Sequence, residues 1–259
     1  RTMRICYVLL SPTFGMHQYT ADLANRMVRA GHKVSLVTTR RYPRDRYVAE
    51  VRVRTPVDTQ DTGFSADALR LSGARAARAE IEALAPEVVH ITGPHAWNLV
   101  LLWLLRRRGI PTAHSLHDLA PHSGSAYGRL LHLWNWGVAG LADQILVHGR
   151  CYRQQLLDGG ATPERVTYTP LLHLSLGASW LEKLDSLAAD VHHEPWGLFF
   201  GRMERYKGVD HLLTAVAAVD GQPQEAPRLV LAGPGDVGAL WTRSLPPGVK
   251  VRSGLVGDD

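Results

Sequence analysis

The stretch WGLFFGRMERYKGVDHLL, residues 196–213, reads as a strand, a loop bounded by glycines and a helix. The apolar run 197–200 predicts a strand, and apolar residues at helical spacing predict a helix over 208–219. In an open parallel sheet, ligands bind beyond the carboxyl ends of the strands. A glycine there lets the backbone approach a phosphate, and the N-terminus of the next helix favours negative charge. The stretch therefore predicts a parallel α/β sheet with an anion-binding loop.

Two cations stand in this loop, Arg202 and Lys207, five residues apart. An arginine binds phosphate oxygens as a planar fork and a lysine binds them as a point charge, so the two side chains together could hold one diphosphate. On residue types alone, a solvated basic loop that ends in a helix-opening glycine explains the pattern equally well.

Strands and helices alternate along the rest of the chain, which is typical of a mostly parallel sheet covered by helices on both faces. Apolar β-rich runs predict strands over 5–10, 34–38, 88–91, 112–116, 144–147, 228–232 and 249–252. Helical spacing predicts helices over 18–30, 66–84, 96–108, 127–140 and 237–244. We place a short strand, 51–54, within a loop over 42–63. Regular alternation lapses after Pro170 and resumes near 195, so two domains are predicted, 1–170 and 195–259, with a linker over 171–194. Because the sequence stops directly after its third late strand, we expect the second domain to be incomplete in this chain.

Composition fits an ordinary globular protein, with 45% hydrophobic and 20% charged residues. The net charge of +5 suits an anionic ligand or peripheral contact with an anionic membrane, and it does not require nucleic acid. The longest apolar run, 99–105, is far shorter than the roughly 20 residues of a membrane helix. Only two cysteines occur, Cys6 and Cys151, and we expect both to be buried and unpaired. With no signal-peptide pattern at the start, a cytoplasmic location is expected.

Weaker patterns suggest other classes of protein. GPGDVG, residues 233–238, matches the G-x-G-x-x-G of dinucleotide-binding enzymes, but Ser253 stands where a ribose-binding acid is expected. An NAD(P)-dependent oxidoreductase therefore stays a remote alternative, and a tight turn is the better interpretation. The 13 histidines show no zinc-like ligand spacing, so neither a metal nor another cofactor is expected. Trp134 and Trp136 have mostly core-like spacing, with the lining of an acceptor cleft as an alternative.

Several segments together resemble the retaining GT-B glycosyltransferases of family 4. The resemblance rests on GRMERYKGVDHLL with PRLVLAGPGD in the second half, and on SPTFGMHQYTADLANRMVRAGHKVSLVTT, EVVHITGPHAWN, AHSLHDLAPHSG and ADQILVHGRCYRQQLLDGGATPERVTYTP in the first. It implies two Rossmann-like domains with mostly parallel sheets. The first would be the acceptor-side domain, and the second would bind the nucleotide-sugar donor.

The resemblance also implies roles for individual residues. Arg202 and Lys207 would bind the donor diphosphate, Gly15 would approach the donor, and His117 would face the transferred sugar as the catalytic-site residue. His117 is also placed at a ligand-binding edge by its own position after the strand 112–116. Its alternative role is that of a histidine that caps a strand or packs in the wall between the domains.

Two features depart from the family pattern. The first loop has Phe14, Gly15 and Met16 where the family often has two adjacent glycines, and Pro170 is followed by two leucines rather than by a Pro-Asn-Gly or Pro-His-Gly turn. The family's later pair of glutamates would lie beyond Asp259 and is not assigned.

The expected function is transfer of a sugar, with retention, from a UDP- or GDP-sugar to an unidentified acceptor in the cleft between the domains. A noncatalytic nucleotide-sugar or carbohydrate-binding protein of the same fold is the alternative from another class.

Overall fold

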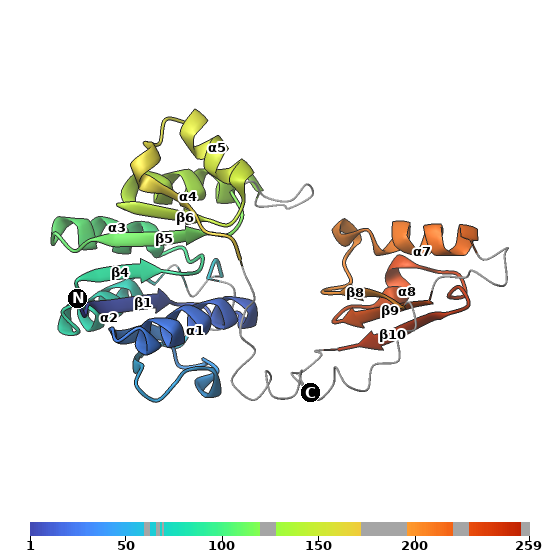
Figure 1. The fold of residues 1–259 in the computed structure, drawn as a ribbon, viewed down its shortest axis with the longest axis horizontal. Coiled ribbons are helices and arrows are strands. Elements are labelled where there is room, and N and C mark those ends of the chain that lie inside the picture. Colours follow the sequence, from blue (N-terminus) through green and yellow to red (C-terminus); the bar gives the residue numbers. More distant parts are fainter. Residues whose placement is uncertain are drawn as a thin grey trace. The chain divides into compact units, whose positions relative to one another are not determined.

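The computed structural model describes residues 1–59, 63–65, 68, 70–119, 128–171, 196–219 and 228–254. The chain forms two compact units. Of the described residues, unit 1 contains those up to Leu171 and unit 2 contains those from Trp196 onward (Figure 1). No helix in these described ranges is long and apolar enough to cross a bilayer.

Unit 1 is built on a sheet of seven parallel strands in the order β3-β2-β1-β4-β5-β6-β7. The strands are β1 (Arg4–Leu9), β2 (Lys33–Thr39), β3 (Arg52–Val57), β4 (Val88–Ile91), β5 (Thr112–Leu116), β6 (Gln144–Val147) and β7 (Val166–Tyr168). The chain builds the sheet outward from β1 to β3, then returns to pair β4 with β1 and continues outward in the other direction. The switch in direction lies between β1 and β4, which is where open parallel sheets form their ligand-binding crevice.

The helices of unit 1 cover both faces of this sheet, as the hydrophobic alternation predicts. They are α1 (Phe14–Arg29), α2 (Leu71–Ala83), α3 (Asn98–Arg107), α4 (Gly128–Leu141) and α5 (Arg150–Asp158), with short 3-10 turns at Arg44–Arg46 and Pro163–Arg165. Tyr7 of β1 packs in the cluster that α1 covers, whereas Val8 packs in the larger cluster under α2, α3, α4 and α5. A strand buried on both faces in this way is typical of parallel sheets.

Some boundaries differ from the sequence prediction for local reasons. Helix α1 begins at Phe14, four residues before the predicted start, because the exposed Gly15 in its first turn carries no apolar signal. Cys6 is buried as expected, but the prediction for Cys151 was wrong: this residue is exposed in the first turn of α5, whose buried side chain is Leu156.

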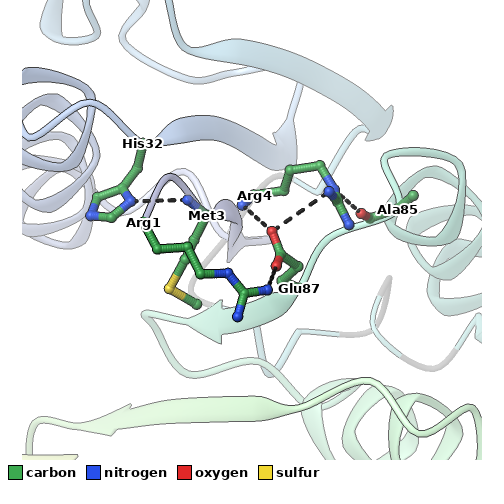
Figure 2. A network of polar contacts seen from close by, with 6 residues as sticks. All are labelled: Arg1, Met3, Arg4, His32, Ala85 and Glu87. Atoms are coloured by element: carbon green, nitrogen blue, oxygen red, sulfur yellow. Dashed lines mark hydrogen bonds and ion pairs between the residues drawn. The ribbon is translucent and has the colours of Figure 1, made fainter.

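The start of β1 is fixed by polar contacts to the loop before β4 (Figure 2). The Glu87 carboxylate accepts a hydrogen bond from the Arg4 backbone N–H at 3.0 Å and pairs with Arg1 at 2.8 Å. These contacts lower the pKa of Glu87, chiefly through the Arg4 backbone hydrogen bond. They lie at the amino ends of the strands, so they anchor the sheet at the edge opposite the ligand-binding crevice.

Unit 2 contains a parallel sheet in the order β10-β9-β8. Its elements are β8 (Trp196–Phe200), a 3-10 turn (Arg205–Lys207), α7 (Val209–Val219), β9 (Arg228–Gly233), α8 (Val237–Leu240) and β10 (Val249–Ser253). Leu213 of α7 and Leu231 of β9 are both fully buried in the core of this unit. The element order confirms a second α/β unit with a parallel sheet.

Candidate functional site

Buried polar side chains gather at the carboxyl ends of β1, β4 and β5. Thr92 follows β4 directly, and its hydroxyl lies 2.7 Å from that of Thr20 on α1. Each hydroxyl also lies within reach of a backbone carbonyl oxygen, that of Met16 for Thr20 at 2.7 Å and that of Val8 for Thr92 at 3.4 Å. The interior of a parallel sheet is mostly apolar, because buried polar groups cost stability unless they are hydrogen-bonded. Buried polar side chains at the switch point therefore indicate the edge of the sheet where a polar ligand could bind.

Gly15 lies at this edge, in the first turn of α1, and is exposed. A Cβ added to Gly15 would meet no described atom within 4 Å. Packing within the protein therefore does not require a glycine here. A close approach by a ligand would require one.

His117 follows β5, and its ring contacts the Thr92 carbonyl oxygen and the Tyr19 ring. Its Nε2 lies 2.8 Å from the Thr92 carbonyl oxygen, and the Tyr19 ring meets it edge-on with centroids 5.0 Å apart. Burial lowers the pKa of His117, although the hydrogen bond to Thr92 opposes this shift, and nearby His148 lowers the pKa further. A carbonyl oxygen only accepts, so Nε2 carries the proton and Nδ1 of the neutral ring carries a lone pair.

A hydrogen-bonded chain lies beside His117 on the face of the sheet that α1 covers. The Tyr19 hydroxyl lies 2.9 Å from the Ser115 hydroxyl, which in turn lies 2.8 Å from His90 Nε2. Burial lowers the pKa of His90 to about 4, with smaller contributions from His117 and His148. These side chains are neutral at pH 7 and hold the strand ends in place.

His148 was not among the predicted site residues. It follows β6, and its ring lies 5.0 Å from that of His117 and 5.1 Å from that of Tyr19. The sheet register pairs Leu116 with Val147, so His117 and His148 occupy equivalent places on neighbouring strands. The only sequence signal is that each histidine directly follows a predicted strand.

The two tryptophans of α4 have packing roles. Trp134 is buried against Phe64 and His114, with ring centroids at 5.3 and 5.8 Å. Trp136 covers Gly159 so closely that a Cβ there would overlap its ring. These contacts favour the core interpretation of the tryptophans over the acceptor-cleft interpretation.

In unit 2, the loop after β8 brings both predicted cations to one aromatic ring. Arg202 Nη2 lies 3.5 Å from the Tyr206 hydroxyl, and Lys207 Nζ lies 5.0 Å from the centroid of the same ring. Arg202 also pairs with Glu204 at 3.1 Å. The side chains of Arg202, Lys207 and Arg205 are all exposed, so the two cations remain accessible to an anion.

The loop after β9 packs on this cationic loop, and its glycines make the contact possible. A Cβ on Gly233 would overlap the Gly201 carbonyl oxygen, and one on Gly235 would lie 2.7 Å from the Met203 carbonyl oxygen. Asp236 caps α8 by accepting a hydrogen bond from the Gly238 N–H at 2.8 Å. Loop packing and capping therefore explain GPGDVG without a dinucleotide.

Among the residues that the structure describes, no group of three or more histidine, cysteine or acidic side chains is arranged to hold a metal ion. The candidate ligand contacts are the exposed side chains of Arg202 and Lys207 in unit 2 and the half-buried His117 in unit 1, whose pKa is lowered by burial.

Comparison with known proteins identifies relatives of this arrangement. The family described as "glycosyl transferase 4-like domain" matches residues 14–171. HepE of Anabaena in complex with UDP-glucose is 16% identical, with a TM-score of 0.61 over 98% of this chain and 70% of HepE. Sucrose-phosphate synthase of Thermosynechococcus elongatus is 19% identical, with a TM-score of 0.69 over 100% of this chain and 72% of that enzyme. MnaA of S. aureus in complex with UDP is 14% identical, with a TM-score of 0.61 over 98% and 70%.

No curated protein sequence matches the chain significantly. At the identities of the solved structures, the likeness shows the fold alone, which is the GT-B fold of glycosyltransferases with two Rossmann-like units. The fold expected from the sequence is confirmed.

Proposed function

The chain belongs to the glycosyl transferase 4-like family, and from this premise we propose that it transfers a sugar from a nucleoside diphosphate donor to an acceptor, with retention of configuration. The observation that carries the proposal is the pair of accessible cations, Arg202 and Lys207, around Tyr206 after strand β8. Residues 1–170 would serve as the acceptor-side domain and residues 195–259 as part of the donor domain, joined by a linker over 171–194.

The proposed chemistry follows from where charge develops. Breaking the bond between sugar and diphosphate leaves negative charge on the leaving group, and fixed cations stabilise that charge without an obligatory metal. Arg202 would exchange its contact with Glu204 for a phosphate oxygen, with Lys207 adding a second positive charge. His117 would orient the transferred sugar through the lone pair on Nδ1.

Two further observations support a uridine donor and a cytoplasmic location. HepE and MnaA were crystallised with UDP-glucose and UDP, which favours a uridine donor. Cys6 and Cys151 are both free, as expected of a protein in the reducing cytoplasm.

The test of function is a panel of nucleotide sugars, screened first for stabilisation of the protein against heat and then for release of nucleoside diphosphate. Stabilisation by one donor together with release supports a transferase. Stabilisation without release in the presence of any acceptor would favour the noncatalytic binding protein instead.

Changing Arg202 or Lys207 to alanine is expected to weaken UDP binding by about 1.5 to 3 kcal/mol, because each change removes a charged hydrogen bond to the diphosphate. Arg205 is also exposed but lies outside the proposed site, so Arg205→Ala serves as the matched control and should bind UDP normally. Calorimetric titration measures the three variants. Wild-type affinity in both the Arg202 and the Lys207 variant would exclude this loop as the diphosphate site.

Gly15→Ala is expected to stabilise α1 while weakening donor binding. Alanine favours a helix over glycine by up to about 1 kcal/mol, and the added methyl group meets no described atom of the protein. A donor lying against this backbone would meet the methyl group, and we expect about a tenfold loss of affinity, roughly 1.4 kcal/mol. Gly140→Ala, in the last turn of α4 with equally open space, should leave binding unchanged. Normal donor affinity in Gly15→Ala would show that the donor does not approach this turn.

A further inference from the structure

His117 and His148 form a pair at the carboxyl ends of neighbouring strands. Each directly follows the last residue pair of the β5–β6 ladder, Leu116 with Val147. Their ring centroids lie 5.0 Å apart, and the Tyr19 ring packs against both. Three elements, α1, β5 and β6, thus place three rings together at the edge of the sheet where ligands gather.

Each imidazole of the pair is anchored by one ring nitrogen to a backbone carbonyl oxygen. Nε2 of His117 lies 2.8 Å from the oxygen of Thr92, and Nδ1 of His148 lies 2.8 Å from the oxygen of Thr169. Since a carbonyl oxygen only accepts, each anchoring nitrogen must carry the proton. In the neutral ring the other nitrogen then carries a lone pair, which is Nδ1 in His117 and Nε2 in His148.

The lone pair of His148 lacks a donor. Within the described part of the chain, Nε2 is shielded from solvent and has no hydrogen-bond partner. A shielded acceptor without a donor costs stability, and such atoms call for a ligand or water that supplies the hydrogen. A ligand hydroxyl that enters beside the rings would regain this lost interaction.

We propose that His148 binds a hydroxyl group of the transferred sugar, which donates to Nε2, while a second hydroxyl donates to Nδ1 of His117. This inference rests on the proposed function and assigns a sugar-recognition role to a residue at the end of β6.

The chemistry of the pair selects a hydroxyl over other ligands. A phosphate oxygen accepts hydrogen bonds at pH 7 and would face two acceptors. A metal ion would accept both lone pairs, but the described residues offer no group of three ligands around it. A sugar brings several O–H donors, and its C–H faces can pack on the rings of Tyr19 and the two histidines.

The tautomers can be measured directly by long-range proton–nitrogen NMR of protein labelled with ¹⁵N-histidine. We expect His148 to be protonated on Nδ1 and His117 on Nε2 at pH 7.5, and we expect the other nitrogen of each ring to shift when UDP-glucose is added but not when UDP is added. The opposite tautomer in His148, or a doubly protonated ring, would overturn the inference.

Two substitutions remove the ring lone pairs but keep the N–H that anchors each side chain to its backbone oxygen. His148→Asn keeps an N–H near the position of Nδ1 for the Thr169 oxygen, and His117→Gln keeps an N–H near the position of Nε2 for the Thr92 oxygen. Each is expected to lower the preference for a sugar nucleotide over its free diphosphate by about tenfold, the value of one good hydrogen bond. UDP affinity should not change. His132→Asn, which alters an exposed histidine of α4, is the matched control.

The titrations use UDP-glucose, UDP-N-acetylglucosamine and GDP-mannose, each compared with its own diphosphate, and thermal melts confirm that every variant folds. An unchanged preference in His148→Asn, or equal losses for sugar nucleotide and diphosphate, would overturn this inference alone. A zinc ion that binds wild type and is lost in His148→Asn would overturn it in favour of a metal. A wild-type protein that binds none of the three donors would refute the proposed function, and this inference with it.

Discussion

Acidification from pH 7 to pH 4 is expected to unfold unit 1, because its core holds neutral histidines that acid must charge. Burial lowers the pKa of His17 and of His90 to about 4, and that of His114 to about 3, against a usual value of 6.5. The nearby backbone of Ser11 opposes the shift in His17, and that of Ser115 opposes the shift in His114, but neither reverses it.

The direction of the effect follows from proton binding. Between pH 6.5 and about 4, the unfolded chain binds protons at these three positions and the folded chain does not. Stability is therefore fully present above pH 6.5 and is lost as the pH falls. At about 1.4 kcal/mol for each pKa unit, acid that protonates one of these histidines in the unfolded chain would lower the stability of unit 1 by on the order of 3 kcal/mol, a large part of the stability of a typical domain.

Urea titrations at several pH values between 7.5 and 4.5, followed by hydrogen exchange in peptides of β1, β4 and β5, measure this loss. His90→Gln should lower the number of protons taken up on unfolding by about one, so the stability should fall less steeply with pH. Glutamine can still form a hydrogen bond with Ser115 but does not titrate. His132→Gln, at an exposed position on α4, should leave the curve unchanged. A stability of unit 1 that stays constant from pH 6.5 to 4.5 would contradict the assignment of these histidines as buried and neutral.

The second large effect is expected in unit 2, where Gly233→Ala should unfold or severely loosen the sheet. The new methyl group would overlap the Gly201 carbonyl oxygen, and Gly233 has a φ of 141°, which L side chains rarely adopt. Overpacking against rigid backbone and backbone strain each cost about 1 to 3 kcal/mol, so we expect a loss of roughly 2 to 6 kcal/mol.

Gly254→Ala separates the cost of overpacking from the cost of backbone strain. Gly254 also has a positive φ, 113°, but a Cβ there meets no described atom within 4 Å. It should cost only the backbone strain, about 1 to 3 kcal/mol. Hydrogen exchange in peptides of β9 and β10 reports both variants. Equal protection in the Gly233 and Gly254 variants would show that the contact between the loops is not tight.

The fold could be predicted from the spacing of apolar residues along the sequence. Short β-branched runs such as 34–38 and 88–91 alternate with amphipathic stretches, and buried parallel strands need just this pattern on both faces. The start of α1 was misplaced because Gly15 gives no apolar signal. The prediction that Cys151 is buried was wrong because burial depends on which side of α5 faces the core, and Cys151 lies on the exposed side.

The candidate site was predictable only where a motif marks it. Arg202 and Lys207 stand in a loop with a clear glycine pattern, and the structure shows that they meet at Tyr206. His148 could not be found this way, because its place beside His117 depends on the register of β5 against β6, which spans more than thirty residues of sequence. The role of Gly233 likewise depends on a contact between two loops that sequence spacing does not reveal.

Hydrogen exchange of the wild-type protein, with and without saturating UDP-glucose, tests the central claim most directly. We expect slower exchange in peptides covering 201–208, where the diphosphate should contact Arg202 and Lys207, and in peptides covering 115–118 around His117. UDP alone should protect only 201–208. Binding of UDP-glucose without protection of 201–208, or with protection confined to other parts of the chain, would contradict the claim that this protein is a nucleotide-sugar transferase with its donor loop after β8.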